Sequence, residues 1–167
     1  ALKNSTYYSQ LQILNLVIKR YWFLILVAKF LTFEDKAMPF VSVTRLRLRS
    51  VKYLIPFWRY AIPSDRQARH AAGNLATATR RTAGNAFWTL TVWDSEAAMR
   101  RYMTSGSHRK AMPKLAEWCD EASTAHWQQD GTELPRWEYA EQYMVTHGRL
   151  HPVKQPSAAH AAGIIKL

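Results

Sequence analysis

The sequence has little of several things that would name a function, and each shortage excludes a class of protein. It has a single cysteine, Cys119, so it can form no disulfide within the chain and cannot supply four cysteines to a zinc ribbon or an iron–sulfur cluster. In the largely apolar segment 11–33, Lys19, Arg20 and Lys29 leave no uncharged run longer than eight residues, whereas a membrane-spanning helix needs about 20. The six histidines include no HExxH motif. We therefore predict a cytoplasmic protein with no metal site and no membrane partner.

Acidic residues are also scarce. The chain has 23 Lys and Arg against 12 Asp and Glu, which gives a net charge of +11. Nine of the bases lie between Arg45 and Arg81, where Asp65 is the one acid. Such a basic half can bind an anion, a nucleic-acid backbone or an anionic membrane surface, although a solvated arginine face is the simpler interpretation. No standard nucleic-acid-reading motif and no glycine-rich phosphate loop is present, so we do not expect a nucleic-acid partner.

The composition changes near Met38. Residues 1–37 are rich in Leu, Ile, Tyr, Lys and Phe and contain one Arg, whereas Arg and Ala dominate from Met38 onward. We interpret residues 1–37 as a non-native or flexible extension, with an amphipathic helix on a membrane surface as the alternative. Residues 38–151 form the predicted domain, and residues 152–167 a predicted mobile tail.

Hydrophobic periodicity predicts the elements of the domain. Pro63 is expected to kink or end the first helix, and the segment 87–93 is the strongest strand because it is β-branched and aromatic throughout. The expected strands are residues 40–49, 75–81, 87–93 and 124–128. The expected helices are residues 50–70, 95–103, 108–122 and 137–144.

This order, β-α-β-β-α-β, is typical of the ferredoxin-like α+β fold, in which two helices cover one face of the sheet. The segment 87–93 is apolar or nearly so on both faces, so its second face also needs a cover. We predict a homodimer in which two sheets pack face to face, a dimeric α+β barrel.

Five short segments carry a resemblance to a known family. They are Ala86-Phe-Trp-Thr-Leu-Thr-Val-Trp-Asp94, Ser95-Glu-Ala-Ala-Met99, Ser105-Gly-Ser-His-Arg109, Ala111-Met-Pro-Lys-Leu115 and Trp118-Cys-Asp-Glu-Ala122. Together they resemble an uncharacterised bacterial family related to spheroidene monooxygenase and, more distantly, to the antibiotic biosynthesis monooxygenase superfamily of dimeric α+β barrels. The resemblance covers about residues 38–156 and implies a pocket between sheet and helices.

The wider superfamily includes cofactor-free oxygenases, haem-degrading enzymes, haem proteins and non-enzymes, so the resemblance leaves the cofactor open between none and haem. Its haem-degrading branch uses an Asn on the first strand and a Trp and a His on the second long helix. Here the first strand has no Asn, Tyr102 stands at the Trp position and Met112 at the His position, with His108 four residues earlier. The sequence therefore departs from that mechanism.

His108 is the predicted catalytic residue. It begins a helix, where the helix dipole disfavours the charged imidazole and so favours a neutral proton acceptor; a hydrogen-bonded cap histidine is the alternative. A pocket for a flat apolar molecule, with two arginines for a ligand carboxylate, is predicted from Trp88, Trp93, Tyr102, Trp118, Arg66 and Arg69. The same aromatic side chains can equally be core residues. We expect His126 to be structural and Cys119 to be a small buried core residue.

We predict a monooxygenase-like protein that acts on a flat apolar substrate in a pocket between sheet and helices. Its cofactor is predicted to be either haem or none. The alternative is a non-catalytic ligand-binding or interaction module on the same fold. A third interpretation is nucleic-acid binding through the basic residues from Arg45 to Arg81, which predicts a binding affinity that falls steeply with salt.

Overall fold

A computed structural model describes residues 19, 21 and 38–167 of the chain. The chain divides after residue 36, and the unit Ala37–Leu167 is the one described below. The predictions made for residues 1–37 therefore lie outside the described residues, apart from residues 19 and 21.

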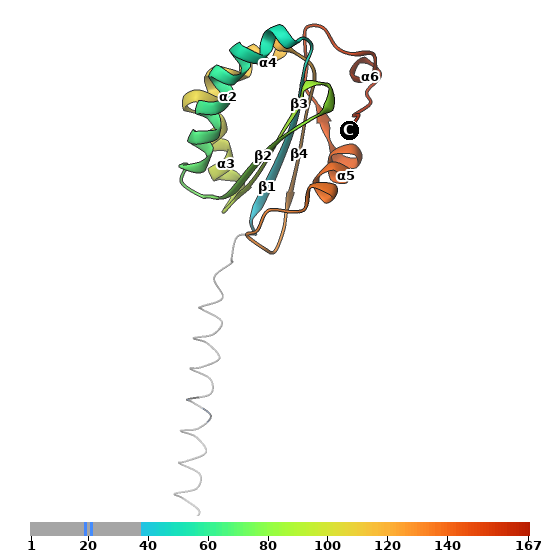
Figure 1. Ribbon diagram of the computed structural model, residues 1–167. Helices are drawn as coiled ribbons and strands as arrows, with labels where there is room; N and C mark the ends of the chain where they lie inside the picture. Colours follow the sequence, from blue (N-terminus) through green and yellow to red (C-terminus); the bar gives the residue numbers. More distant parts are fainter. Residues whose placement is uncertain (1–18, 20, 22–37) are drawn as a thin grey trace, which may run out of the picture. The chain divides into compact units, whose positions relative to one another are not determined.

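Five antiparallel strands form one sheet, in the order β2-β3-β1-β4-β5 (Figure 1). The segments whose alternating sequence pattern predicted a strand do form strands. The arrangement confirms the ferredoxin-like α+β fold. The strands are β1 (Phe40–Leu48), β2 (Asn74–Thr82), β3 (Ala86–Trp93), β4 (Cys119–Gln128) and β5 (Arg149–Leu150).

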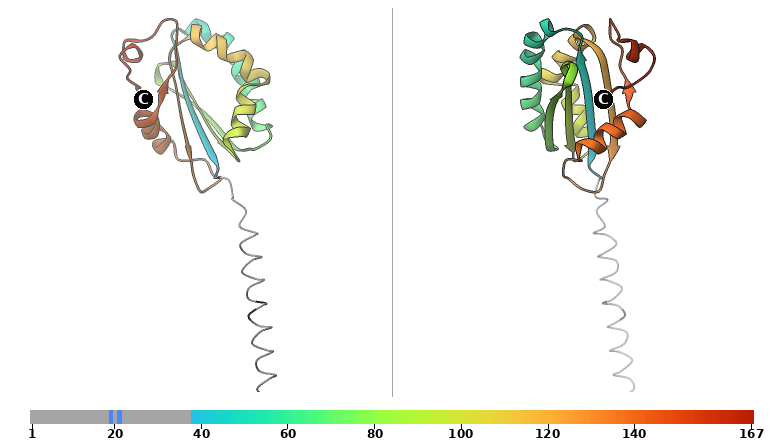
Figure 2. Two further views of the ribbon diagram at one scale, coloured as in Figure 1. Left: turned by 180° about the vertical axis from the view of Figure 1, so that it is seen from behind. Right: turned by 45° about the vertical axis from the view of Figure 1, so that its right-hand side comes forward.

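Three helices lie on one face of the sheet: α2 (Leu54–Arg69), α3 (Glu96–Met103) and α4 (Gly106–Trp118) (Figures 1 and 2). A short 3-10 turn, Val51–Tyr53, leads into α2, and the hydroxyl of Ser95 caps α3 by accepting a hydrogen bond from the Ala98 amide. Of the described helices, none combines the length and the apolar character that crossing a bilayer requires.

The second face of the sheet is covered by the chain itself. Helix α5 (Trp137–His147) and the short α6 (Ala158–Ala161) lie on this side (Figure 2). Ala140 and Met144 of α5 are fully buried with Trp88, Leu90 and Val92 of β3, none of which is more than 1% exposed. The prediction that a twin subunit is needed to bury the second face of β3 is thus wrong, because the chain's own helix α5 buries that face.

Pro63 does not end the first helix, because α2 continues from Leu54 to Arg69, and the kink that the sequence predicted as the alternative stays a prediction. Proline has no backbone N–H, so the carbonyl of Arg59, four residues earlier, loses its usual amide donor. Both Pro63 and Arg59 lie on the exposed side of α2. Water can solvate that carbonyl, so the helix tolerates the missing hydrogen bond.

The boundary between α4 and β4 also differs from the prediction, which continued the helix to Ala122. The helix ends at Trp118, and β4 begins at once with Cys119. Ion pairs with β1 explain the change. Arg47 forms a bidentate pair with Asp120, at 2.9 and 2.8 Å, and Arg45 Nη1 lies 2.6 Å from Glu121 Oε2. These partners are more than 70 residues apart, so local periodicity could not reveal them.

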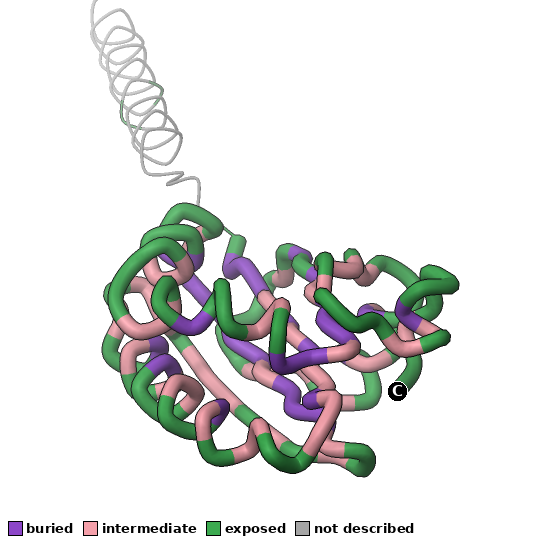
Figure 3. The backbone as a smooth tube through the Cα atoms, turned by 90° about the horizontal axis from the view of Figure 1, so that it is seen from above, coloured by how far each residue is buried: buried purple, intermediate pink, exposed green. Residues whose placement is uncertain are grey.

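The segment 152–167 lies along both layers of the domain. Val153 packs against the cluster around Trp118, and Ile165 packs against the cluster around Met144. The Ser157 hydroxyl donates a hydrogen bond of 2.8 Å to Glu121. The mobility that we expected of this tail stays a prediction. Figure 3 shows that buried residues concentrate along the strands and that the outer sides of the helices are exposed.

Candidate functional site

The sheet presents a polar surface to helices α2, α3 and α4. Strand pairing sets two rows of side chains across four strands on this face, and all eight are hydroxyl-bearing except one histidine. We call these rows the hydroxyl floor. Its first row is Thr79, Thr89, Thr44 and Thr124, and its second is Thr77, Thr91, Ser42 and His126.

Apolar clusters hold the helices to the sheet on either side of the hydroxyl floor. Near one end Phe57 of α2 packs with Phe87 and Trp118, and near the other Ala98 and Met99 of α3 pack with Phe40 and Trp93. The helices are therefore anchored at both ends of the strands, and the polar surface lies between the anchors.

Solvent reaches the hydroxyl floor. Ser42 and Thr44 lie in the middle of β1, which is the central strand, yet both are only half-buried. On the opposite face of the same strand, Val41 and Val43 are 0% exposed. A central-strand side chain beneath a helical layer keeps solvent contact only where the layer does not pack down on it. The space between helices and sheet is thus accessible at its centre.

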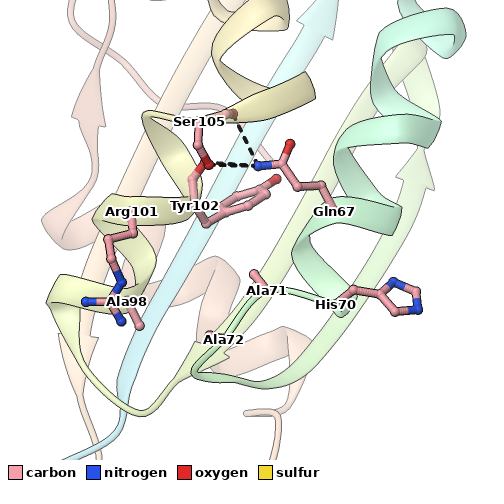
Figure 4. Close-up of a pocket in the computed structure, with 8 residues that line it drawn as sticks. All are labelled: Gln67, His70, Ala71, Ala72, Ala98, Arg101, Tyr102 and Ser105. Carbon is pink, nitrogen blue, oxygen red and sulfur yellow. Dashed lines mark hydrogen bonds between the residues drawn. The ribbon is translucent and has the colours of Figure 1, made fainter.

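A hollow of about 340 Å³ opens between the C-terminal end of α2 and α3 (Figure 4). Gln67 and Tyr102 point toward one another across it, while the charged end of Arg101 and the ring of His70 lie at its margin. Gln67 ties the two sides together, because its Nε2 donates to the Ser105 carbonyl at 3.2 Å and its Oε1 accepts from the His108 amide at 3.1 Å. The lining residues are Gln67, His70, Ala71, Ala72, Ala98, Arg101, Tyr102 and Ser105.

Tyr102 links this hollow to the sheet through contacts among three rings, of which Trp93 and Tyr102 are stacked and His108 is tilted. Its ring centroid lies 5.2 Å from that of Trp93 and 4.7 Å from that of His108. Its hydroxyl donates to the Ser64 carbonyl of α2 at 3.2 Å. Burial, with a smaller effect of the Asp65 charge, raises the pKa of the phenol well above its usual range, so the side chain stays protonated. Tyr102 is therefore a neutral aromatic wall rather than an acid or base.

His108 is held in one tautomer. Its Nδ1 lies 3.0 Å from the Met103 carbonyl, which can only accept, so Nδ1 carries the proton. Burial lowers the pKa of His108, and the Met103 hydrogen bond opposes this only in part. The ring is therefore neutral near pH 7, and its Nε2 lone pair is the one able to accept a proton. This is the protonation state that the sequence analysis expected of a proton acceptor.

A hydrogen-bonded imidazole and hydroxyl lie at the β4 side of the hydroxyl floor. The Nε2 of His151 and the Oγ1 of Thr124 are 2.7 Å apart. Burial is the main cause that lowers the pKa of both His151 and His126. The Arg149 charge lowers the pKa of His151 further, whereas the Glu96 carboxylate opposes the lowering at His126 without reversing it. Both rings therefore favour the neutral form, which can donate and accept hydrogen bonds at once.

The six predicted pocket residues do not come together. Trp93 and Tyr102 stack on one another, but Trp88 points to the opposite face of the sheet, where it packs under α5 between Arg45 and Arg80. Adjacent positions of a strand alternate between faces, so Trp88 and Trp93, which are five positions apart, point to opposite faces. Trp88 cannot line a pocket between sheet and helices, and that assignment is corrected.

The remaining predicted residues lie around the helical layer. Trp118 is buried at the far end of α4, where it stacks with Tyr53 and Tyr60. Arg69 pairs with Asp65 one turn away and donates to the Thr77 carbonyl at 3.1 Å. Arg66 is exposed on the outer side of α2. Neither arginine lines the hollow of Figure 4, so their pairing with a ligand carboxylate stays a prediction.

The part of the chain that the structure describes contains no group of three or more His, Cys, Asp or Glu side chains that could hold a metal ion. Cys119 is fully buried, and burial followed by the nearby Asp120 charge raises the pKa of its thiol to about 12, so it is no nucleophile. A haem iron needs one free imidazole nitrogen, and His108 offers Nε2. Haem therefore stays a prediction.

Sequence reasoning missed the hydroxyl floor. Its signal was present, because Ser or Thr occupies alternate positions in β1, β2 and β3, at Ser42 and Thr44, Thr77 and Thr79, and Thr89 and Thr91. Each strand alone resembles an ordinary half-exposed strand. Only the pairing register brings the six side chains into two continuous rows.

A protein-family model described as a domain of unknown function, DUF3291, matches residues 65–151, which is slightly more than half of the chain. The match covers the end of α2 through β5 and therefore includes Tyr102, His108 and most of the hydroxyl floor. No curated protein matches the chain in sequence.

Solved structures show the same fold at low identity. A Pseudomonas aeruginosa protein has a TM-score of 0.51 and 11% identity, over 57% of this chain and 97% of its own. A conserved Methanosarcina mazei protein has a TM-score of 0.50 and 12% identity, over 56% and 95%. A Nitrosomonas europaea protein, proposed in its description to be an antibiotic biosynthesis monooxygenase, has a TM-score of 0.50 and 10% identity, over 58% and 95%. These likenesses establish the fold alone.

Proposed function

The chain belongs to the DUF3291 family, whose function is unknown, and we propose that it binds a small planar molecule between helices and sheet and acts on it as a monooxygenase. The binding step is supported by one observation above all: Ser42 and Thr44 keep solvent contact at the centre of the domain. The oxidation step is supported by the fold, which the chain shares with a protein described as a monooxygenase.

The surfaces around this space refine the substrate that the sequence predicted. The half-buried ring of Tyr102, which is backed by the fully buried Trp93, favours a flat apolar ring system. The hydroxyl floor favours oxygen atoms at the edge of that ring system, because the hydroxyls of Thr44 and Thr89 can each donate and accept a hydrogen bond. The proposed substrate class is therefore a planar aromatic molecule with hydroxyl or keto groups.

We assign the proton-accepting role to His108, as the sequence analysis did. A hydroxylated aromatic ring becomes easier to oxidise when it loses its phenolic proton, and a neutral imidazole with a free Nε2 can take that proton. Gln67 and Tyr102 fix the position of the ring: Gln67 accepts a hydrogen bond from the His108 amide, and the Tyr102 ring packs at a tilt against the imidazole.

The test is binding and turnover of a dihydroxynaphthalene by the full chain, measured by quenching of tryptophan fluorescence and by oxygen uptake. Wild type should bind and consume oxygen, and H108N should bind equally well while losing most of the uptake. The double variant T44V/T89V should lose affinity by about tenfold or more, because two hydroxyls that hydrogen-bond the ligand are removed. Absence of both binding and oxygen uptake would overturn the proposal.

A non-catalytic ligand-binding module is the second candidate. It predicts that the same probe binds, that T44V/T89V weakens it, and that no oxygen is consumed at any pH. The homodimer and the cytoplasmic location stay proposals. Because α5 buries the face of β3 on which the dimer argument rested, a dimer would have to use another surface.

A further inference from the structure

The outer side of the first helical segment carries an exposed apolar seam, in which Trp58 also contacts the sheet through Phe87, with ring centroids 5.3 Å apart. Four large apolar side chains are exposed on it, at 67% for Val51, 77% for Ile55, 43% for Trp58 and 46% for Ile62. They are spaced by four, three and four residues. This is the alternation of a and d positions in a coiled coil, which keeps one stripe facing a second helix. Single exposed apolar residues are ordinary, but a stripe with this spacing marks an interface.

A row of positive charges runs beside the seam. Lys52, Arg59 and Arg66 follow one another at seven-residue spacing, so they occupy the same heptad position, and all three are exposed. Among residues 38–167, none of the three has a carboxylate within ion-pair distance. Charges flanking a seam choose the partner and its direction.

The seam is separate from the proposed substrate space. The residues of α2 that face the sheet and the hollow are Phe57, Ser64, Gln67 and Ala68, which are buried or half-buried. The seam lies on a different side of the same helix, as Ile55 and Ile62 are exposed. Figures 1 and 2 show α2 at the outside of the helical layer, where no other described element covers it.

We propose that this seam binds an amphipathic helix of a partner protein whose apolar stripe is flanked by acidic residues. Charge complementarity selects this occupant. A second copy of the chain in an antiparallel pairing would bring Lys52, Arg59 and Arg66 against the same three cations. In a parallel pairing these cations would need acids at the opposite flank of the seam, where Leu54 and Ala61 pack into the core instead.

Two other occupants fit less well. Residues 1–37 of the chain carry five bases and two acids, and a net positive segment does not complement a basic row. A lipid surface would be met by a broad apolar and basic plane, whereas the seam is one line of side chains with heptad spacing.

The experiment uses the full chain and a synthetic 21-residue helical peptide with Leu at a and d and Glu at e and g, labelled with fluorescein. A matched peptide carries Lys in place of every Glu. Fluorescence anisotropy at low salt should show binding of the Glu peptide alone, and its affinity should fall by about tenfold or more as salt screens the charges. The charge-reversed protein K52E/R59E/R66E should prefer the Lys peptide.

Variants separate the apolar seam from the charges. I55Q/I62Q should weaken the Glu peptide by about tenfold or more while keeping the salt dependence, because both side chains are exposed and the fold does not need them. V145Q, which changes an apolar residue of α5 that is 43% exposed, and R101E, on α3, should leave the affinity unchanged.

Several outcomes would overturn the proposal. They are no binding of the Glu peptide at low salt, equal binding of both peptides, or an effect of V145Q and R101E as large as that of the seam variants. Tighter binding to vesicles containing phosphatidylglycerol than to the peptide would assign the seam to a lipid surface. A concentration-dependent dimer that I55Q/I62Q abolishes would assign it to a second copy.

Discussion

Tyr102 joins three parts of the domain at the level of single residues. Its ring stacks on Trp93 of the sheet and packs at a tilt against His108 of α4, and its hydroxyl donates to the Ser64 carbonyl of α2. Y102F keeps both ring contacts and loses one hydrogen bond, so we expect a loss of about 1 kcal/mol in unfolding free energy. Y102A also leaves a cavity and should cost about 3 kcal/mol or more. Urea denaturation of the three proteins measures both, and equal losses would contradict the stacking role.

The buried His108 should make stability depend on pH. Burial lowers its pKa below the ordinary value of about 6.5, so the unfolded chain binds the proton more tightly than the folded one. Stability is then fully present above the unfolded pKa and falls as the pH drops below it. H108N can keep the bond to the Met103 carbonyl without titrating. Denaturation at several pH values between 7 and 5 should show a smaller loss for H108N than for wild type; identical slopes would contradict this.

The candidate site was predictable only where single residues carried the signal. His108 and Tyr102 stood out by their positions in a motif and do lie together. Trp88 was grouped with them by residue type, but the alternation of β3 sends it to the other face. The hydroxyl floor depends on cross-strand register, which sequence patterns leave unspecified until the strand order is known.

Among the elements, the turn between α2 and β2 is unusually crowded. Gly73 has φ +86°, and a Cβ added there would lie 2.6 Å from both the Ala98 Cβ and an Asp94 carboxylate oxygen. Gly84, in the turn before β3, has φ +68° but nothing within 4 Å of such a Cβ. Both alanine variants have the left-handed backbone strain, of about 1–2 kcal/mol. G73A should lose about 2 kcal/mol more than G84A in urea denaturation, and similar losses would argue against the crowding.

Strand β4 depends on a buried ion pair with β1. Arg45 and Glu121 are both about 4% exposed, and Ser157 donates a second hydrogen bond to Glu121. Burial alone would raise the pKa of Glu121, but the bonds from Arg45 and Ser157 and the charges of Arg45 and Arg47 outweigh it and lower the pKa. E121A leaves the Arg45 charge buried without its partner and should cost about 3–5 kcal/mol.

The double variant R45M/E121L is the control for this pair. It removes both charges and replaces them with apolar groups of similar size, so it should be more stable than E121A. Thermal and urea unfolding of wild type, E121A and the double variant give the comparison. If R45M/E121L were the less stable of the two variants, the ion pair itself, rather than the unpaired charge, would be what holds β4 to β1.

Elements were predictable in proportion to how local their causes are. Strands β1, β2 and β3 and helix α3 follow from alternation, turn residues and the Ser95 cap, and they form close to the predicted residues. The helical pattern of residues 108–122 misled at its end, because Asp120 and Glu121 are held in β4 by arginines more than 70 residues away. Such long-range pairs are invisible to a local pattern.

At the scale of the whole molecule, the sheet is covered differently on its two faces. Under α5 the covered side chains are apolar and dry, with Val41, Val43 and Val92 at 0% exposure. Under α2, α3 and α4 the centre is polar and reached by solvent. The largest apolar cluster therefore lies on the α5 face, and the other face holds an open, hydroxyl-lined space between two smaller clusters.

Helix α5 should accordingly protect the domain from aggregation. Ala140 is 0% exposed in the cluster under α5, whereas Val145 on the same helix is 43% exposed. A140E places a charge in that cluster, so it should displace α5, destabilise the protein by several kcal/mol (about 3 or more) and uncover apolar sheet surface. Light scattering after size exclusion should then show larger particles for A140E but not for V145E. If A140E kept the wild-type mass and stability, α5 would not be the cover of this face.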